Sequence, residues 1–210
     1  MVDSPPRADP PYVPIRHTRW PVRRTPRGVL LACVALLAVA LLVGLAHKPS
    51  QAQRASDLRG FLTDMNTGIE SCAGGVSESL TVLRQIETGA SHDLATAINI
   101  AQTGANNCSP ANSMALDDLE QYQVTESLAS FRLARVVTGL VNWAAPDAVN
   151  VQTDVATVLQ AGRGQARSRA VATLRQALGK LDAQRSAVDS VIESAIRSLS
   201  ADAEPPHLPG

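Results

Sequence analysis

Hydrophobic residues after position 50 recur at helical spacing. From Ala55 to Leu83 the apolar residues are separated by three or four positions, which places them on one face of a helix. This pattern predicts a helix over residues 51–87, in which Gly74 and Gly75 favour a kink, because glycine costs roughly 1 kcal/mol in a helix interior. Sustained period-two alternation is absent from residues 50–201, and aromatic residues make up 3% of the chain, so a sheet is not expected.

The same spacing predicts four further helices. The second follows an N-cap at Ser91 and ends near Cys108, and the third runs from Ser109–Pro110 to about Ala144. The fourth opens at Pro146 and ends at Gly162, and the fifth covers residues 165–200. The positions predicted to be buried are Leu94, Ile98, Ala101, Ala105 and Cys108, then Leu116, Leu119, Leu128, Phe131, Val137 and Leu140, then Val151, Val155, Val158 and Leu159, and finally Val171, Leu174, Leu178, Leu181, Val188, Ile192, Ala195 and Leu199.

Short connections between these helices require neighbours to run antiparallel. We therefore expect an all-α chain whose residues 50–201 form an elongated antiparallel bundle of about five helices, followed by a flexible tail over residues 202–210 that contains three prolines. The heptad-like stripes of the first and last helices also allow the bundle to associate as a homo-oligomer.

The segment of residues 28–46 contains no charged side chain. A helix of this length is roughly 28 Å long, which matches the hydrocarbon core of a bilayer, so we expect one N-terminal transmembrane helix whose partner is the lipid bilayer. Arginines gather before the segment, and the positive-inside rule leaves the N-terminus in the cytoplasm and the C-terminal domain outside it. The alternative is a signal peptide that is cleaved near Ser50–Ala52 and releases a secreted bundle.

Charge divides the chain further. Residues 1–27 hold seven prolines and six arginines against two acids, which predicts a disordered cytoplasmic tail. Residues 47–210 hold 13 basic and 17 acidic side chains, so a basic nucleic-acid-binding protein is excluded as a class. Arginine outnumbers lysine 17 to 2, a bias that fits a GC-rich bacterial genome.

The three cysteines suggest one disulfide. Cys33 lies within the apolar segment, so Cys72 and Cys108 are the pair left in the domain expected in an oxidising compartment. Both lie in register with the apolar stripes of their helices, at similar distances from the turn at Gly89. We therefore predict a Cys72–Cys108 bridge, the alternative being two buried free thiols.

Motifs for catalysis are missing from the sequence. None of the four histidines has a second ligand at metal-pair spacing, and no nucleophile motif of a hydrolase occurs, so we expect no catalytic, cofactor-binding or metal-binding residues and no enzyme. Asp117, Asp118 and Glu120 form an acidic cluster. Either they offer oxygen ligands to a divalent cation or they interact with the positive end of the third helix.

Four arginines lie around the start of the fifth helix, where the helix dipole disfavours cations: Arg163, Arg167, Arg169 and Arg175. They are candidates for contact with anionic headgroups, teichoic-type polymers or an acidic partner, and the alternative is a solvated face paired with nearby acids. Gln184 or Arg185 interrupts the apolar stripe of the same helix between Leu181 and Val188. Such a polar residue either fixes the register of the helices or lines a ligand pocket, and the alternative is that it reaches solvent.

These observations lead to one functional expectation. The chain is a single-pass cell-membrane protein whose extracytoplasmic bundle binds a protein or another component of a bacterial cell envelope. The alternatives are a structural oligomerising anchor or spacer and an enzyme that uses the interior of the bundle.

Overall fold

The computed structural model describes residues 33–39 and 48–209. The chain divides into two units, residues 1–47 and 48–210. The helices of the second unit are α2 (Gln51–Thr88), α3 (Leu94–Asn107), α4 (Met114–Glu120), the 3₁₀ helix η1 (Glu126–Phe131), α5 (Ala134–Asn142), the distorted helix η2 (Trp143–Ala148), α6 (Val149–Gln160) and α7 (Gln165–Leu199). No strand occurs in either described range, so the expectation of an all-α chain is confirmed there.

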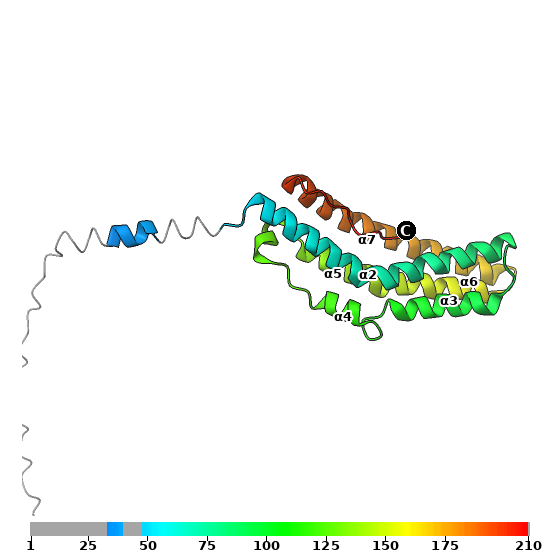
Figure 1. Ribbon diagram of the computed structural model, residues 1–210. Coiled ribbons are helices and arrows are strands. Elements are labelled where there is room, and N and C mark those ends of the chain that lie inside the picture. The colour runs from blue at the N-terminus through cyan, green and yellow to red at the C-terminus, as the bar shows by residue number, and fades with distance from the viewer. Residues whose placement is uncertain (1–32, 40–47, 210) are drawn as a thin grey trace, which may run out of the picture. The chain divides into compact units, whose positions relative to one another are not determined.

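Residues 48–209 fold as a helical bundle with four arms that run alternately up and down (Figure 1). α2 is the first arm, α3 with α4 and η1 the second, α5 to α6 the third, and α7 the fourth. Neighbouring arms pack in this order, with α3 against α2, α6 against α3, and α7 against α6. A helical bundle is therefore present, but it has four arms in place of about five antiparallel helices, because the segments before and after Pro146 belong to one arm. Two of the four arms are broken into shorter helices.

The first helix extends over 38 residues, as the apolar stripe predicts. Ser50 caps its N-terminus through a hydrogen bond to the Gln53 backbone amide, and Gly89, with a φ of 73°, ends it in the left-handed conformation. Gly74 and Gly75 lie in the middle of α2 and do not interrupt it. The helix is therefore not broken at these glycines, because the packing of α3 along α2 outweighs the helix propensity of two residues.

The second arm differs most from the prediction. Asp93 and not Ser91 caps α3, and Ser113 caps α4 in place of the predicted start at Ser109. The single helix expected up to Ala144 is wrong, since residues 121–125 leave the helix between α4 and η1. The apolar stripe is interrupted in this stretch, and no buried residue lies between Leu119 and Leu128.

Polar contacts to α2 hold this non-helical stretch in place. Tyr122 donates its hydroxyl hydrogen bond to Asp64 at 3.1 Å, and Ser127 donates to Asp57 at 2.6 Å. The ring of Tyr122 also packs edge-on against Phe61, with 5.7 Å between the ring centroids. These contacts replace the helical hydrogen bonds that the sequence pattern predicted.

The third arm is continuous in direction but distorted at Pro146. Ala145 has extended backbone angles (φ −134°, ψ 112°), as expected for a residue that precedes proline, and α6 follows after Ala148. The four positions predicted to be buried in α6 are at most 3% exposed: Val151, Val155, Val158 and Leu159.

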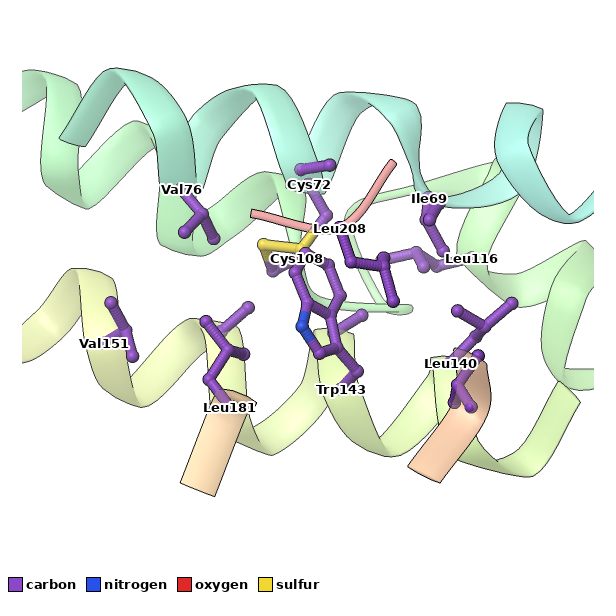
Figure 2. Close-up of a cluster of buried hydrophobic side chains, with 14 of the residues drawn as sticks. Ile69, Cys72, Val76, Cys108, Leu116, Leu140, Trp143, Val151, Leu181 and Leu208 are labelled. Atoms are coloured by element: carbon purple, nitrogen blue, oxygen red, sulfur yellow. A yellow bond between two sulfur atoms is a disulfide. The ribbon is translucent and has the colours of Figure 1, made fainter. Parts of the chain in front are cut away.

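The C-terminal segment folds back on the bundle, whereas the sequence predicted a flexible tail. Ser200 adopts a left-handed conformation and ends α7, and the chain then returns toward the middle of the bundle (Figure 1). Residues 203–207 lie against the face of α2 that includes Leu62 and Asn66. Leu208 is 4% exposed and belongs to the same cluster of buried side chains as Cys72 and Trp143 (Figure 2).

The predicted transmembrane helix lies largely outside the described residues. Of residues 28–46, residues 33–39 are described, and they are helical. Among the described helices none combines the length and the apolar character that a membrane span requires.

Candidate functional site

The predicted disulfide is present. Cys72 of α2 and Cys108, at the C-terminal end of α3, are bonded, with their Cα atoms 4.6 Å apart. The two cysteines are 1% and 0% exposed. The prediction from the similar sequence distances of the two cysteines to the turn at Gly89 is confirmed. The bridge links the first two arms of the bundle (Figure 2).

Beside the bridge, α2 and α3 cross at two glycines. A Cβ atom on Gly75 would lie 2.9 Å from the Gly104 Cα atom and 3.1 Å from the Gln152 Oε1 atom. The helices therefore approach too closely for any side chain at Gly75 unless a neighbour moves. Gly74, one position earlier, has open space around its own Cβ direction.

Gln152 of α6 is a fully buried polar residue over this crossing. Its amide nitrogen donates to the Cys108 Sγ atom at 3.0 Å and lies 3.4 Å from the Ala148 carbonyl. Its amide oxygen lies 3.2 Å from the buried Ser79 hydroxyl, which also lies 2.7 Å from the Gly75 carbonyl, so these two acceptors share the single hydroxyl proton. The polar atoms of Gln152 and Ser79 thus pair with one another, with the bridge and with the backbone inside the core.

The apolar pattern of the sequence does not predict this cluster. Gln152 lies between Val151 and Val155, on the face that also carries Ala148, and a lone glutamine in an apolar stripe was the available signal. The second polar interruption, Gln184 of α7, was identified and reaches a partner, because its amide donates to the Gly139 carbonyl at 3.2 Å.

Three of the arginines around the start of α7 line a groove that contains no acidic residue among the residues described. Arg163, Arg167 and Arg175 line a groove of about 440 Å³ together with Ser168 and Val171. Three of the four predicted residues are thus brought together. Arg169 is exposed and does not line the groove.

One of these arginines is held by the protein itself. Arg167 donates one guanidinium nitrogen to the Val158 carbonyl at 3.1 Å and places another 3.3 Å from a Glu87 carboxylate oxygen. These contacts join α2, α6 and α7 at one end of the bundle, and they satisfy a carbonyl in the last turn of α6. The alternative of pairing with nearby acids is therefore correct for Arg167.

Arg163 and Arg175 differ from Arg167. Both are exposed, and neither has a carboxylate within 4.0 Å in the described part of the chain. Gly164 precedes the first turn of α7 without a side-chain cap, and that turn contains no acidic residue. The groove is therefore a site of net positive charge whose guanidinium groups are open to an anion.

The acidic residues do not gather into one site. Asp117 accepts a hydrogen bond from the Gln121 amide at 3.1 Å, whereas Asp118 lines a groove of about 280 Å³ opposite Asp64 and Tyr122. Burial and the hydrogen bond to Asp64 raise the pKa of Tyr122. Among the described residues no group of three His, Cys, Asp or Glu side chains is placed to hold a metal ion.

Comparisons with known proteins give no further guide to the site. No protein-family model, no curated protein and no solved structure matches the chain.

Proposed function

We propose that this chain is a single-pass membrane protein whose disulfide-linked bundle lies outside the cytoplasm and binds a component of the cell envelope. The observation that carries the proposal is the buried Cys72–Cys108 bridge. Structural disulfides persist in oxidising compartments and are rare in the cytosol. A bridge at the centre of the core therefore supports an extracytoplasmic location for residues 48–210.

The charge pattern around residues 28–46 supports the same orientation. Five arginines lie between residues 16 and 27, and Lys48 is the one lysine or arginine in the six residues that follow Ala46. This asymmetry favours a cytoplasmic N-terminus, so it supports the same extracytoplasmic location of the bundle as the disulfide does.

A binding role is supported by the surface of the bundle. The groove at Arg163 presents guanidinium groups at the end of the bundle opposite Lys48. The helix that separates these two ends, α2, is roughly 57 Å long, because each of its 38 residues adds about 1.5 Å. A bundle that enters the envelope at Lys48 can therefore present the groove well away from the point of anchoring.

Reporter fusions test the topology. Alkaline phosphatase fused after Gly210 should be active, and a green fluorescent protein fused at the same position should not fluoresce after export through the general secretory route. The matched control places each reporter after Arg27, where the outcome should be reversed. An inactive phosphatase together with a fluorescent green fluorescent protein fused after Gly210 would contradict the proposal.

Two measurements separate the alternatives. Recovery of a mature N-terminus near Gln53 would replace the anchor with a cleaved signal and give a secreted bundle. Light scattering on the purified chain distinguishes a binding module from an oligomerising spacer, since the spacer requires a stable oligomer whereas the binding module functions as a monomer.

A further inference from the structure

The charges of α7 are unevenly distributed along the helix. Between Asp154 and Asp182 the chain contains five cations and no acidic residue: Arg163, Arg167, Arg169, Arg175 and Lys180. The helix dipole disfavours a cation in or just before the first turn, where Arg163 and Arg167 lie, and it has little effect on the cations further along. The dipole therefore gives no reason for this concentration of positive charge.

Contacts within the bundle account for only part of the basic half. Glu87 neutralises Arg167, and no ion pair involving Arg163, Arg169, Arg175 or Lys180 occurs in the described residues. Arg163, Arg167 and Arg175 line one groove together with Ser168. An anion in this groove would therefore meet the unpaired guanidinium groups of Arg163 and Arg175, and that of Arg167, which Glu87 and the Val158 carbonyl hold in place.

We propose that the groove lined by Arg163, Arg167 and Arg175 binds phosphate groups of a polyanionic ligand. This inference rests on the proposed binding role of the bundle and names the chemistry of its ligand. Guanidinium groups form paired, charge-assisted hydrogen bonds with the oxygens of a phosphate, and four of the five cations are arginine. Arg167 and Arg175 are eight residues apart on α7, which separates them by about 12 Å along the helix axis, so a chain with several phosphates suits the groove better than a single small anion.

Phosphate is favoured over a carboxylate-bearing partner for a geometric reason. The groove is open and lies at the turn between α6 and α7, where the first backbone amides of α7 have no side-chain cap. Amides in this position and guanidinium forks together match the tetrahedral arrangement of phosphate oxygens. Two sources share this chemistry, namely a soluble phosphate-linked polymer and a surface of phospholipid headgroups.

The test uses the full chain in phosphatidylcholine nanodiscs at fixed ionic strength. The first probe is a fluorescein-labelled polyphosphate, followed by anisotropy, and the second is sedimentable vesicles of phosphatidylglycerol. Polyglutamate of the same charge serves as the carboxylate comparison. The test variant is Arg163→Gln with Arg175→Gln, and the matched control is Arg84→Gln with Arg169→Gln, which removes two exposed, unpaired cations near the same end but outside the groove.

We expect the test variant to bind phosphate about tenfold more weakly, the loss expected when charge-assisted hydrogen bonds are removed at an exposed site. The control should change affinity by less than about twofold, because it alters only the screened field of distant charges. Loss of polyphosphate binding in the test variant alone supports a soluble polymer as the ligand. The same pattern seen only with vesicles supports the lipid headgroup.

Three results would overturn the inference: equal losses in the two double variants, no binding of either phosphate probe, or polyglutamate binding at least as tight as that of polyphosphate. The last of these identifies an acidic protein as the partner. Because the reporter fusions do not depend on ligand binding, a failure here leaves the proposed topology standing, and a reversed topology is detected separately.

Discussion

Gly74 and Gly75 are adjacent in α2, yet replacement by alanine should have opposite effects at the two positions. The Cβ atom of Gly74→Ala enters open space, so the variant gains only helix propensity, about 1 kcal/mol of stability. The Cβ atom of Gly75→Ala meets the Gly104 Cα atom at 2.9 Å and the Gln152 Oε1 atom at 3.1 Å. The propensity gain is the same at both sites, so the difference between the variants isolates the steric cost of the crossing.

That cost should lie at about 1–3 kcal/mol, the usual range for an added methyl group in a packed core. We expect a value near the top of this range, because the bridge between Cys72 and Cys108 prevents α2 and α3 from moving apart. Any displacement of Gln152 also weakens its hydrogen bonds to Ser79 and Cys108. The net effect of Gly75→Ala should therefore be a loss of up to about 2 kcal/mol, against a gain at Gly74.

Urea denaturation of residues 48–210 measures this difference. Trp143 is the sole tryptophan of that fragment and is fully buried, so its fluorescence reports unfolding of the core. Stabilities of the two variants that agree within about 0.5 kcal/mol would refute the close crossing, since only a separation wide enough for a methyl group makes the two positions equivalent.

Three further predictions concern other parts of the bundle. Reduction of the bridge, whose cysteines are 36 residues apart, should lower the free energy of unfolding by about 3.8 kcal/mol in the chain-entropy expression. Equal stabilities in urea titrations with and without reductant would contradict a structural role of the bridge. Leu208→Ala should lower the free energy of unfolding by about 2–3 kcal/mol. The loss caused by truncation after Ser200 is the upper limit of this effect, because a detached tail loses all its contacts with the bundle. A loss in Leu208→Ala that exceeds the loss in the truncated chain would contradict docking of the tail. Burial raises the pKa of Asp154, so ionisation of this carboxyl destabilises the fold once the pH rises above its pKa in the unfolded state. The melting temperature of Asp154→Asn should therefore exceed that of the parent protein at pH 7. The difference should vanish below the pKa of Asp154 in the unfolded state.

Helices with long apolar stripes could be predicted from the sequence almost to the residue. α2 and α7 begin and end within one residue of the predicted ranges, 51–87 and 165–200. Each stripe buries a row of large side chains, which include Leu58 and Met65 in α2 and Leu181 and Ile192 in α7. Such a row determines the helix and its orientation together, because only one rotation of the helix removes the whole row from water.

The buried face of α3 could be predicted only in part. Ala101 and Cys108 are buried as predicted, whereas the predicted Leu94 is 41% exposed, and Ala97 and Gly104 are buried at positions that the pattern does not mark. α3 packs closely on α2 at Gly75, and a close approach selects small side chains regardless of their hydrophobicity. A hydrophobic pattern ranks residues by transfer free energy and therefore cannot detect an interface that is selected for small size.

Both the broken second arm and the docked tail depend on contacts between distant parts of the sequence. Tyr122 leaves its helix to reach Asp64, 58 positions earlier, and Leu208 is buried in the cluster that surrounds the disulfide. Local sequence propensities cannot predict either of these distant contacts. The candidate groove was predictable in part, since the arginines stand out as a cluster against the dipole, but the pairing of Arg167 with Glu87 required the fold.

The core and the charged end of the bundle therefore follow different rules. At mid-bundle the buried polar atoms of Gln152 and Ser79 have hydrogen-bond partners and the bridge lies beside the crossing of α2 and α3, whereas the buried Trp143 Nε1 atom has no partner in the described residues. Near the start of α7, the exposed Arg163 and Arg175 line one groove and have no acidic partner in the described residues. A group of unpaired guanidinium groups in one groove is the argument for placing the proposed binding site at this end of the bundle.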